Sequence, residues 1–217
     1  MPLKTILLLM LCMSSLLSFT SYQSKDLSPG LPEQHLPLPL IAQAHSWSCG
    51  AAAMLSVLSY WQVYDGNESS LYSGLGTTDQ DGTDPLNMAK FAQSLDLEAE
   101  VKVNQTIADL YQGLLHKKTV ILDIQAWGGT GTDPIDYENR WEDGHYVVLV
   151  AIDRAYLYFM DPSVIGGYAF MAKKDLVKRW HDYEIRNGER VENMQLAIYI
   201  QGSDAVSSFP KKLLRID

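Results

Sequence analysis

The sequence predicts an α+β protein, with helices in its first half and an antiparallel sheet in its second half. Apolar residues recur at helical spacing before residue 117, whereas short apolar and β-branched runs dominate after residue 118. These two periodicities are the main sequence signal of secondary structure, so the change between them separates a helical part from a strand part. The sequence contains no internal repeat.

Length and composition indicate one folded domain behind an export segment. The chain has 217 residues, of which 47% are hydrophobic and 20% are charged, as in an ordinary soluble protein. Its net charge of -9 repels phosphate backbones, so we expect no nucleic-acid partner. The predicted organisation is a signal peptide over 1–24, an extended N-terminal arm over 25–35, the domain over 36–205 and a C-terminal tail over 206–217.

Residues 1–24 have the pattern of a secretory signal peptide. Lys4 supplies the positive start, 6–17 the apolar run, and Ser18-Phe19-Thr20 a small-x-small cleavage pattern. An uncleaved membrane anchor is the alternative, but the run is shorter than the roughly 20 residues that a spanning helix needs. We therefore expect an exported protein, periplasmic or extracellular, with no stable membrane insertion after cleavage.

Cleavage would leave Cys49 as the only cysteine of the exported protein, because Cys12 lies in the signal segment. An intramolecular disulfide is then impossible. An unpaired cysteine outside the cytosol is either buried and inert or retained for its reactivity. The neighbours of Cys49 must decide between these alternatives.

The stretch after Cys49 predicts a helix that begins at this residue. Apolar side chains follow one helical stripe, made by Met54, Val57, Leu58 and Trp61. We expect the helix to span 49–64, with Ser46 or Ser48 as its cap. The N–H groups of a first turn and the helix dipole favour an anion, so this position favours the thiolate that a nucleophilic cysteine requires.

Two further helices are predicted before the strands. Asp84 caps the first, Pro85 suits its first position, and its buried stripe runs to Leu95. Thr106 and Asp109 resemble a capping box at the start of the second helix, which continues to residue 116.

The segments after residue 118 make up the predicted sheet. Segment 146–152 is apolar throughout, as expected for a strand that is buried on both faces, and Asp153-Arg154 forms the turn to its hairpin partner. A short amphipathic helix over 174–181 interrupts the strands. The other predicted strands are 119–126, 155–160, 168–171 and 194–201.

Two residues of the predicted hairpin are candidates for acid–base chemistry. His145 begins the buried strand, where a side chain can face a cleft on a rigid backbone. Asp161 follows sixteen residues later, at the far end of the partner strand, so strand pairing would bring the two side chains together. A carboxylate fixes the tautomer of the imidazole, which can then take the proton of the Cys49 thiol.

Gln43 is the candidate for binding an oxyanion. It lies six residues before Cys49, so its amide can turn back and share a developing oxyanion with the backbone N–H of Cys49. Substrate contacts are expected from Trp47, Trp127 and Gly144. Trp127 begins a loop of about 18 residues between two strands, and loops of that length are usually functional.

Each of these residues also has an ordinary structural interpretation. His145 can be a hydrogen-bonded core histidine, Asp161 a turn former before proline, and Gln43 a surface amide. His45 is an alternative base, on a loop close to Cys49. Asp153 is an alternative partner for the imidazole, although its turn position is expected to point it towards solvent.

The sequence predicts no metal and no cofactor. Loop 79–84 has alternating carboxylates and a glycine, but it lacks the third alternating ligand and the bidentate glutamate of a calcium loop. Helix capping by Asp84 is the preferred interpretation. One cysteine and scattered histidines form no zinc pattern.

Three motifs, in this order, resemble cysteine peptidase family 39, the papain-like family of bacteriocin-processing peptidases and their stand-alone relatives. They are Gln43 with 48–52 (SCGAA), then 141–150 (WEDGHYVVLV), then 159–163 (FMDPS). The similarity covers residues 36–200. The resemblance implies a papain-like fold with Cys49 as nucleophile, His145 as base, Asp161 as its orienting residue and Gln43 in the oxyanion hole.

The chain also departs from the members of that family that cleave leader peptides. Those members are fused to an ABC transporter, face the cytosol and cut after Gly-Gly, whereas this chain has the predicted export signal and no transporter segments. Ser48 stands where those members usually have Asp. The resemblance therefore implies an extracytoplasmic thiol hydrolase that acts on a peptide or protein substrate and leaves the substrate's identity open.

Two other functions would use the same residues. A catalytically silent peptide-binding module would keep the cleft without turnover, and an acyl transferase would pass the acyl group to an amine. We expect a monomer in each case.

Overall fold

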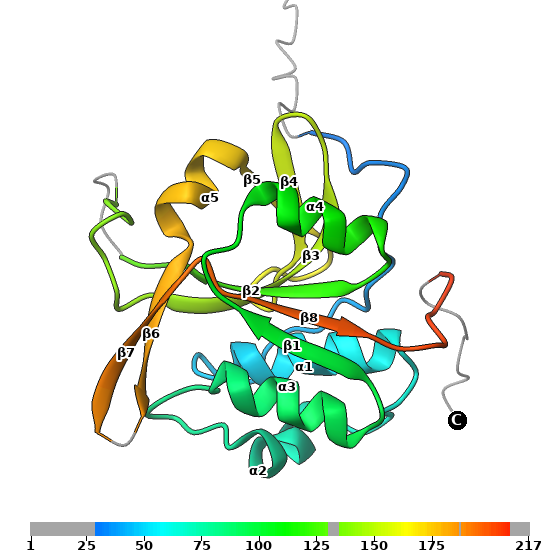
Figure 1. Ribbon diagram of the computed structural model, residues 1–217, viewed down its shortest axis with the longest axis horizontal. Coiled ribbons are helices and arrows are strands. Elements are labelled where there is room, and N and C mark those ends of the chain that lie inside the picture. The colour runs from blue at the N-terminus through cyan, green and yellow to red at the C-terminus, as the bar shows by residue number, and fades with distance from the viewer. Residues whose placement is uncertain (1–28, 130–134, 187, 209–217) are drawn as a thin grey trace, which may run out of the picture. The chain divides into compact units, whose positions relative to one another are not determined.

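The computed structural model describes residues 29–129, 135–186 and 188–208 (Figure 1). The chain divides into two units, Met1–Gly30 and Leu31–Asp217, and the fold described below is that of the second unit. The predicted signal segment 1–24 lies outside the described residues, as do the start of the predicted arm and most of the predicted tail. Among the described helices, none is both long and apolar enough to cross a membrane.

The centre of the fold is an antiparallel sheet with the strand order β1-β8-β2-β3-β4-β5 (Figure 1). A second, two-stranded sheet pairs β6 with β7. The strands of the large sheet are β1 (Glu98–Lys102), β2 (Thr119–Gln125), β3 (Gly144–Ile152), β4 (Tyr156–Met160), β5 (Ala169–Ala172) and β8 (Ala197–Gln201), and those of the small sheet are β6 (His181–Arg186) and β7 (Glu189–Met194).

Helices cover both faces of the large sheet (Figure 1). α1 and α3 pack in the core on one face, whereas α4 and α5 pack in the core on the other. The helices are α1 (Cys49–Tyr60), α2 (Tyr72–Leu75), α3 (Pro85–Ser94), α4 (Ile107–Leu115) and α5 (Lys173–Arg179), with a 3-10 turn, η1 (Glu68–Leu71), before α2.

Strand β3 contributes to both cores, as its continuous apolar sequence predicts. Tyr146 and Val148 pack in the core with α1, while Val147 and Leu149 pack in the core with α4 and α5. Alternate side chains of a strand point to opposite faces, so β3 is buried on both. Packing on both faces therefore holds the backbone of β3 rigid, including its second residue, His145.

The predicted helix starts are confirmed. The Asp84 carboxylate accepts a hydrogen bond from the Leu86 N–H at 2.6 Å, and Pro85 is the first residue of α3. At α4, Thr106 accepts from the Asp109 N–H while the Asp109 carboxylate accepts from the Thr106 N–H, which is a complete capping box.

The prediction that the first helix continues to Tyr64 was wrong, because α1 ends at Tyr60. Gln62 adopts a left-handed conformation with φ of 60°. The N–H of Val63 then donates to the Leu58 carbonyl and that of Gln62 to the Ser59 carbonyl, which is a Schellman motif. Glycine usually marks such an end, so a glutamine gave no signal in the sequence.

A Schellman motif also ends α3 and α4. Asp96 after α3 and Lys117 after α4 have φ of 60° and 58°. Leu97 N–H donates to the Ala92 carbonyl, and Lys118 N–H donates to the Gly113 carbonyl. Each of these three helices therefore ends in a Schellman motif whose left-handed position holds a residue other than glycine. A positive φ costs such a residue free energy, because its Cβ crowds the backbone.

Three strands were not predicted, and all of them are rich in charged residues. β1 lies at the edge of the large sheet with alternating exposed and half-buried side chains, and β6 and β7 form a ribbon with few buried residues. The predicted helix 174–181 ends at Arg179, because His181 begins β6. The predicted last strand, 194–201, begins only at Ala197, because Met194 ends β7.

The left-handed residue after α4 provides a direct test of the cost of these helix ends. Lys117 is exposed, so its replacement removes little packing. We expect Lys117→Gly to raise the free energy of unfolding by about 1 kcal/mol, because glycine adopts a positive φ without steric cost. Lys117→Ala keeps the Cβ and should leave stability nearly unchanged. Urea denaturation of the two variants measures the difference, and equal stabilities would contradict the interpretation.

Candidate active site

Cys49 is the first residue of α1, is free, and is 8% exposed. Ser48 occupies the N-cap position, as predicted, but its hydroxyl does not cap the helix. It accepts a hydrogen bond from the His45 N–H and donates to the His45 carbonyl, both at 3.0 Å. The N–H groups of the first turn of α1 therefore have no cap from Ser48 next to the thiol.

Gly50 explains how the start of α1 fits against the loop before α3. A Cβ at this position would lie 2.7 Å from the Cβ of Thr83, and no real Cβ approaches so closely. Thr83 in turn accepts a hydrogen bond at its carbonyl from the Tyr146 hydroxyl at 3.0 Å. The glycine after the cysteine thus allows α1, β3 and the loop before α3 to meet beside Cys49.

His145 and Asp161 lie in direct contact. The Nε2 atom of His145 is 2.7 Å from Oδ1 of Asp161, and both residues are 5% exposed. Two further donors hold the carboxylate: the Ser163 N–H binds Oδ1 at 2.8 Å, and the Trp127 indole N–H binds Oδ2 at 3.1 Å. The carboxylate is thereby fixed on both oxygens.

Cys49 lies close enough to His145 to raise the pKa of its ring. Because Nε2 faces Asp161, the ring nitrogen left for the sulfur is Nδ1. Burial alone would lower the pKa of His145, but hydrogen bonds with Asp161 and Cys49 and the charges of these groups raise it from 6.5 to about 9. The site favours an imidazolium between two groups that can be anions, which is the charge arrangement of a thiolate–imidazolium pair.

Gln43 is held by the two residues that follow Asp161. Its backbone N–H donates to the Pro162 carbonyl at 3.0 Å, and its side-chain carbonyl accepts from the Ser163 hydroxyl at 3.1 Å. Its side-chain nitrogen donates to the His45 carbonyl at 2.8 Å. An amide nitrogen carries two hydrogens, so one N–H remains for another acceptor.

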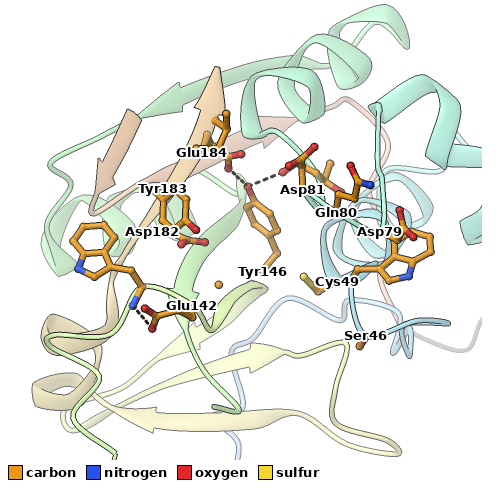
Figure 2. Close-up of a pocket in the computed structure, with 16 residues that line it drawn as sticks. Ser46, Cys49, Asp79, Gln80, Asp81, Glu142, Tyr146, Asp182, Tyr183 and Glu184 are labelled. Carbon is orange, nitrogen blue, oxygen red and sulfur yellow. Dashed lines mark hydrogen bonds between the residues drawn. The ribbon is translucent and has the colours of Figure 1, made fainter. Parts of the chain in front are cut away.

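A cavity of about 320 Å³ opens beside Cys49 (Figure 2). Two of the predicted substrate-contact residues, Trp47 and Gly144, line it. Trp47 stacks on His45 with ring centroids 4.7 Å apart. The third, Trp127, lines a different cavity of about 520 Å³ together with Asp161, and this residue is 61% exposed.

The alternative partners found in the sequence lie elsewhere. His45 is an exposed residue whose ring stacks on Trp47.

The turn position of Asp153 predicted a carboxylate that faces solvent, but the residue is half-buried. Its carboxylate accepts from the N–H groups of Ala155 and Tyr156 and from the Tyr158 hydroxyl, each at 2.7 Å, so it holds the β3–β4 turn together. The hydrogen bond from Tyr158 is the largest of the contributions that lower its pKa.

The ribbon of β6 and β7 supplies residues that the sequence did not single out. Asp182, Tyr183 and Glu184 line the cavity beside Cys49 (Figure 2). Gly144 permits this approach, because a Cβ there would lie 2.0 Å from an Asp182 carboxylate oxygen. The only sequence signal was the glycine before His145, which carries no information about its partner.

Metal ligation has no support in the part of the chain that the structure describes, where no group of three or more His, Cys, Asp or Glu residues is arranged to hold a metal ion. Loop 79–84 instead bridges Thr78 to Gly82 and caps α3 through Asp84.

Comparison with known proteins identifies the family. The "Peptidase_C39 like family" matches residues 35–186, most of the chain. The chain belongs to the peptidase C39-like family. The α+β papain-like fold and the family resemblance found in the three sequence motifs are confirmed. No curated protein sequence matches this C39-like chain.

Solved structures agree with the C39-like fold. A C39-like peptidase from Bacillus anthracis is 15% identical with a TM-score of 0.54, over 79% of this chain and 100% of that one. The peptidase domain of Streptococcus ComA, a bi-functional ABC transporter, is 20% identical with a TM-score of 0.53, over 76% and 98%. A double glycine motif protease from an AMS/PCAT transporter, in complex with its leader peptide, is 18% identical with a TM-score of 0.50, over 79% and 97%. At these identities the likeness concerns the fold alone.

The raised pKa of His145 predicts a pH dependence of stability. Its pKa is about 9 in the fold against 6.5 ordinarily, so its stabilising contribution is complete below about pH 6.5 and is lost as the pH rises through 9. On the order of 3 kcal/mol should be lost in the wild type, and less in Asp161→Asn. The stability difference between the two proteins should therefore shrink as the pH rises across this range.

Denaturant unfolding of both proteins at a series of pH values measures this difference. The comparison cancels other groups that titrate in the same range, among them Glu184, whose pKa is about 8. His45→Gln, which changes an exposed histidine, is the control and should follow the wild type. Parallel wild-type and Asp161→Asn curves would contradict the assignment of this contact.

Proposed function

We propose that this chain is an extracytoplasmic cysteine peptidase that cleaves peptide bonds with Cys49, His145 and Asp161. The observation that carries the proposal is the hydrogen bond between the His145 ring and a fixed Asp161 carboxylate, with Cys49 at the edge of a cavity and near enough to raise the pKa of that ring. Membership of the peptidase C39-like family supports cysteine peptidase activity. A thiol, an imidazole and a carboxylate in this order form the arrangement used in nucleophilic catalysis.

The reaction follows from the positions of these three groups. The Cys49 thiolate attacks the carbonyl carbon of the scissile amide, and the His145 imidazolium gives its proton to the leaving nitrogen as the C–N bond breaks. Neutral His145 then takes a proton from water, whose oxygen attacks the thioester, and returns it to the sulfur as the acid product leaves. Asp161 stays ionised and orients the ring throughout.

The oxyanion of each tetrahedral intermediate needs donors next to the sulfur. The backbone N–H of Cys49 is at the start of α1, where no intrahelical acceptor exists. The unused N–H of the Gln43 side chain is the second donor in this proposal. Ser163 and Pro162, which hold Gln43, follow Asp161 directly, so donor and base share one support.

Export and a peptide substrate are further parts of the proposal. The charge and apolar pattern of 1–24 supports export. One similar structure contains a leader peptide, which supports a peptide as the ligand of this chain. After removal of 1–24 a monomeric enzyme without a membrane anchor is proposed.

Alkylation of Cys49 tests the nucleophile and its base. Iodoacetamide at mildly acidic pH should modify the wild type, because the imidazolium of His145 stabilises the thiolate. His145→Ala should slow modification at least about 10-fold, since it removes that charge. His45→Ala is the matched control and should react like the wild type. Mass spectrometry of the intact protein measures the extent. Equal rates in the wild type and His145→Ala would exclude His145 as the activating base.

Cleavage of a peptide library tests the reaction itself. Wild-type protein should generate new peptide termini that Cys49→Ala does not generate. Binding of peptides without any cleavage would indicate a silent binding module. Products larger than either reactant, formed in the presence of an added amine, would indicate an acyl transferase.

Gln43→Ala tests the oxyanion-binding role. Loss of one such donor is expected to lower kcat by about 10²-fold to 10³-fold with little change in KM, because the interaction is made only in the transition state. Gln43→Glu, which keeps the shape and the acceptor but replaces the donor with a negative charge, should be at least as impaired, because that charge also repels the oxyanion. Initial-rate kinetics on a peptide found in the library measures both, and a variant with wild-type kcat would refute the assignment.

A further inference from the structure

The cavity beside Cys49 is acidic on two sides. Figure 2 shows carboxylates from the β6 ribbon on one side and from the loop before α3 on the other, with the Cys49 sulfur and the Tyr146 ring between them. The five acidic lining residues are Asp79, Asp81, Glu142, Asp182 and Glu184. The lining, drawn from described residues, contains no lysine, arginine or histidine.

None of these five carboxylates forms an ion pair within the ranges that the structure describes. The charges of Arg186 and His181 still act on Glu184 and Asp182, whose pKa values they lower. The two deepest accept hydrogen bonds from neutral groups: Asp182 from the Gln125 side chain at 3.1 Å and Glu184 from the Tyr146 hydroxyl at 3.4 Å. Both are half-buried, so water screens their charges less than it screens those of the exposed Asp79 and Asp81.

Strand β2 adds a buried acidic residue, Asp123, close to Asp182 and Glu184. Asp123 of β2 is 1% exposed, and neither of its oxygens has a hydrogen-bond partner among the described residues. It lies opposite Tyr146 in the β2–β3 pairing. Burial, followed by the charges of Asp182 and Glu184, raises its pKa well above the ordinary range and so favours its protonated form, which lies close enough to Asp182 to donate a hydrogen bond to it.

The pKa of Glu184 indicates that its acidic neighbours outweigh its basic neighbour. Burial and the charges of Asp84 and Asp182 raise this pKa to about 8, although the charge of Arg186 lowers it. A cation in the cavity would offset this repulsion, since an opposite charge favours the ionised carboxylate.

We propose that this cavity binds a lysine or arginine side chain of the peptide substrate, with the cationic group against Asp182 and Glu184. This inference rests on the proposed peptidase function and adds a substrate class to it. Trp47, Tyr146 and Tyr183 supply aromatic surface for the apolar stem, while the rim carboxylates attract the cation from solvent. The cavity of about 320 Å³ admits one such side chain. It opens next to the Cys49 sulfur, which attacks the substrate peptide in this proposal.

Peptide binding to Cys49→Ala tests the cavity apart from catalysis. The probes are N-acetylated, C-amidated peptide libraries with neutral random flanks and one fixed residue, which is lysine, acetyl-lysine, arginine, citrulline or glutamate. Fluorescence polarisation is measured above pH 8, where Glu184 is ionised. Lysine and arginine libraries should bind at least about 10-fold more tightly than acetyl-lysine and citrulline libraries, because only the charge differs.

Three isosteric variants locate the effect. Asp182→Asn and Glu184→Gln keep the size and the hydrogen-bond acceptors, and each should reduce the preference for lysine over acetyl-lysine several-fold. Glu189→Gln changes an exposed carboxylate of the same ribbon that does not line the cavity, so it should keep the preference. Thermal unfolding of each variant checks that it is folded.

Several outcomes would overturn the proposal. They are equal binding of the lysine and acetyl-lysine libraries, no binding of either, or an equal loss of preference in Glu189→Gln, which would indicate general charge attraction. Failure of the peptidase function is separate: selective binding of lysine peptides without cleavage by the wild type would leave the cavity assignment intact. Cleavage of acetyl-lysine peptides as efficient as that of lysine peptides would refute the cavity and retain the peptidase.

Discussion

The hydrogen bond between His145 Nε2 and Asp161 Oδ1 is the contact on which the site depends. It joins the start of β3 to the residue after β4, and Trp127, which follows β2, binds the second oxygen of the same carboxylate. Three neighbouring strands of one sheet therefore hold the ring. With Nε2 occupied in this way, Nδ1 is the ring nitrogen left for the sulfur of Cys49, which begins α1.

Two glycines let separate elements reach this point. Gly50 allows the loop before α3 to touch the start of α1, and Gly144 allows Asp182 to lie against the start of β3. In both cases the glycine stands next to a proposed catalytic residue because a neighbouring element occupies the space of a Cβ. Packing alone thus accounts for the Cys-Gly and Gly-His pairs in the sequence, independently of any contact with substrate.

Opposite charges are separated within a short distance at this site. Asp161 and Cys49 favour a protonated His145, whereas Asp123, Asp182 and Glu184 bring three acidic groups together, and the charge of Arg186 offsets the repulsion on Glu184 only in part. The imidazolium is therefore well placed to offset the repulsion that a thiolate would experience from the acidic wall. The same wall favours a cationic group in the cavity, so catalysis and substrate preference draw on one electrostatic field.

Much of the fold was predictable where local signals agree. Asp84, Thr106 and Asp109 mark helix starts, and the continuous apolar run of β3 marks a strand with two buried faces. Helix ends were less predictable, because Gln62, Asp96 and Lys117 take a conformation normally assigned to glycine. The ribbon of β6 and β7 was not predicted, because these strands carry alternating charged residues and few buried side chains.

The sequence by itself determined the fold class, the family and the three side chains proposed for catalysis, because these depend on local periodicity and on short motifs. Only the tertiary structure decided that Trp127 supports Asp161, that Asp153 holds a turn, and that Asp182 and Glu184 stand beside Cys49. These contacts join residues from strands and loops that no local pattern relates, and the fold alone brings them together.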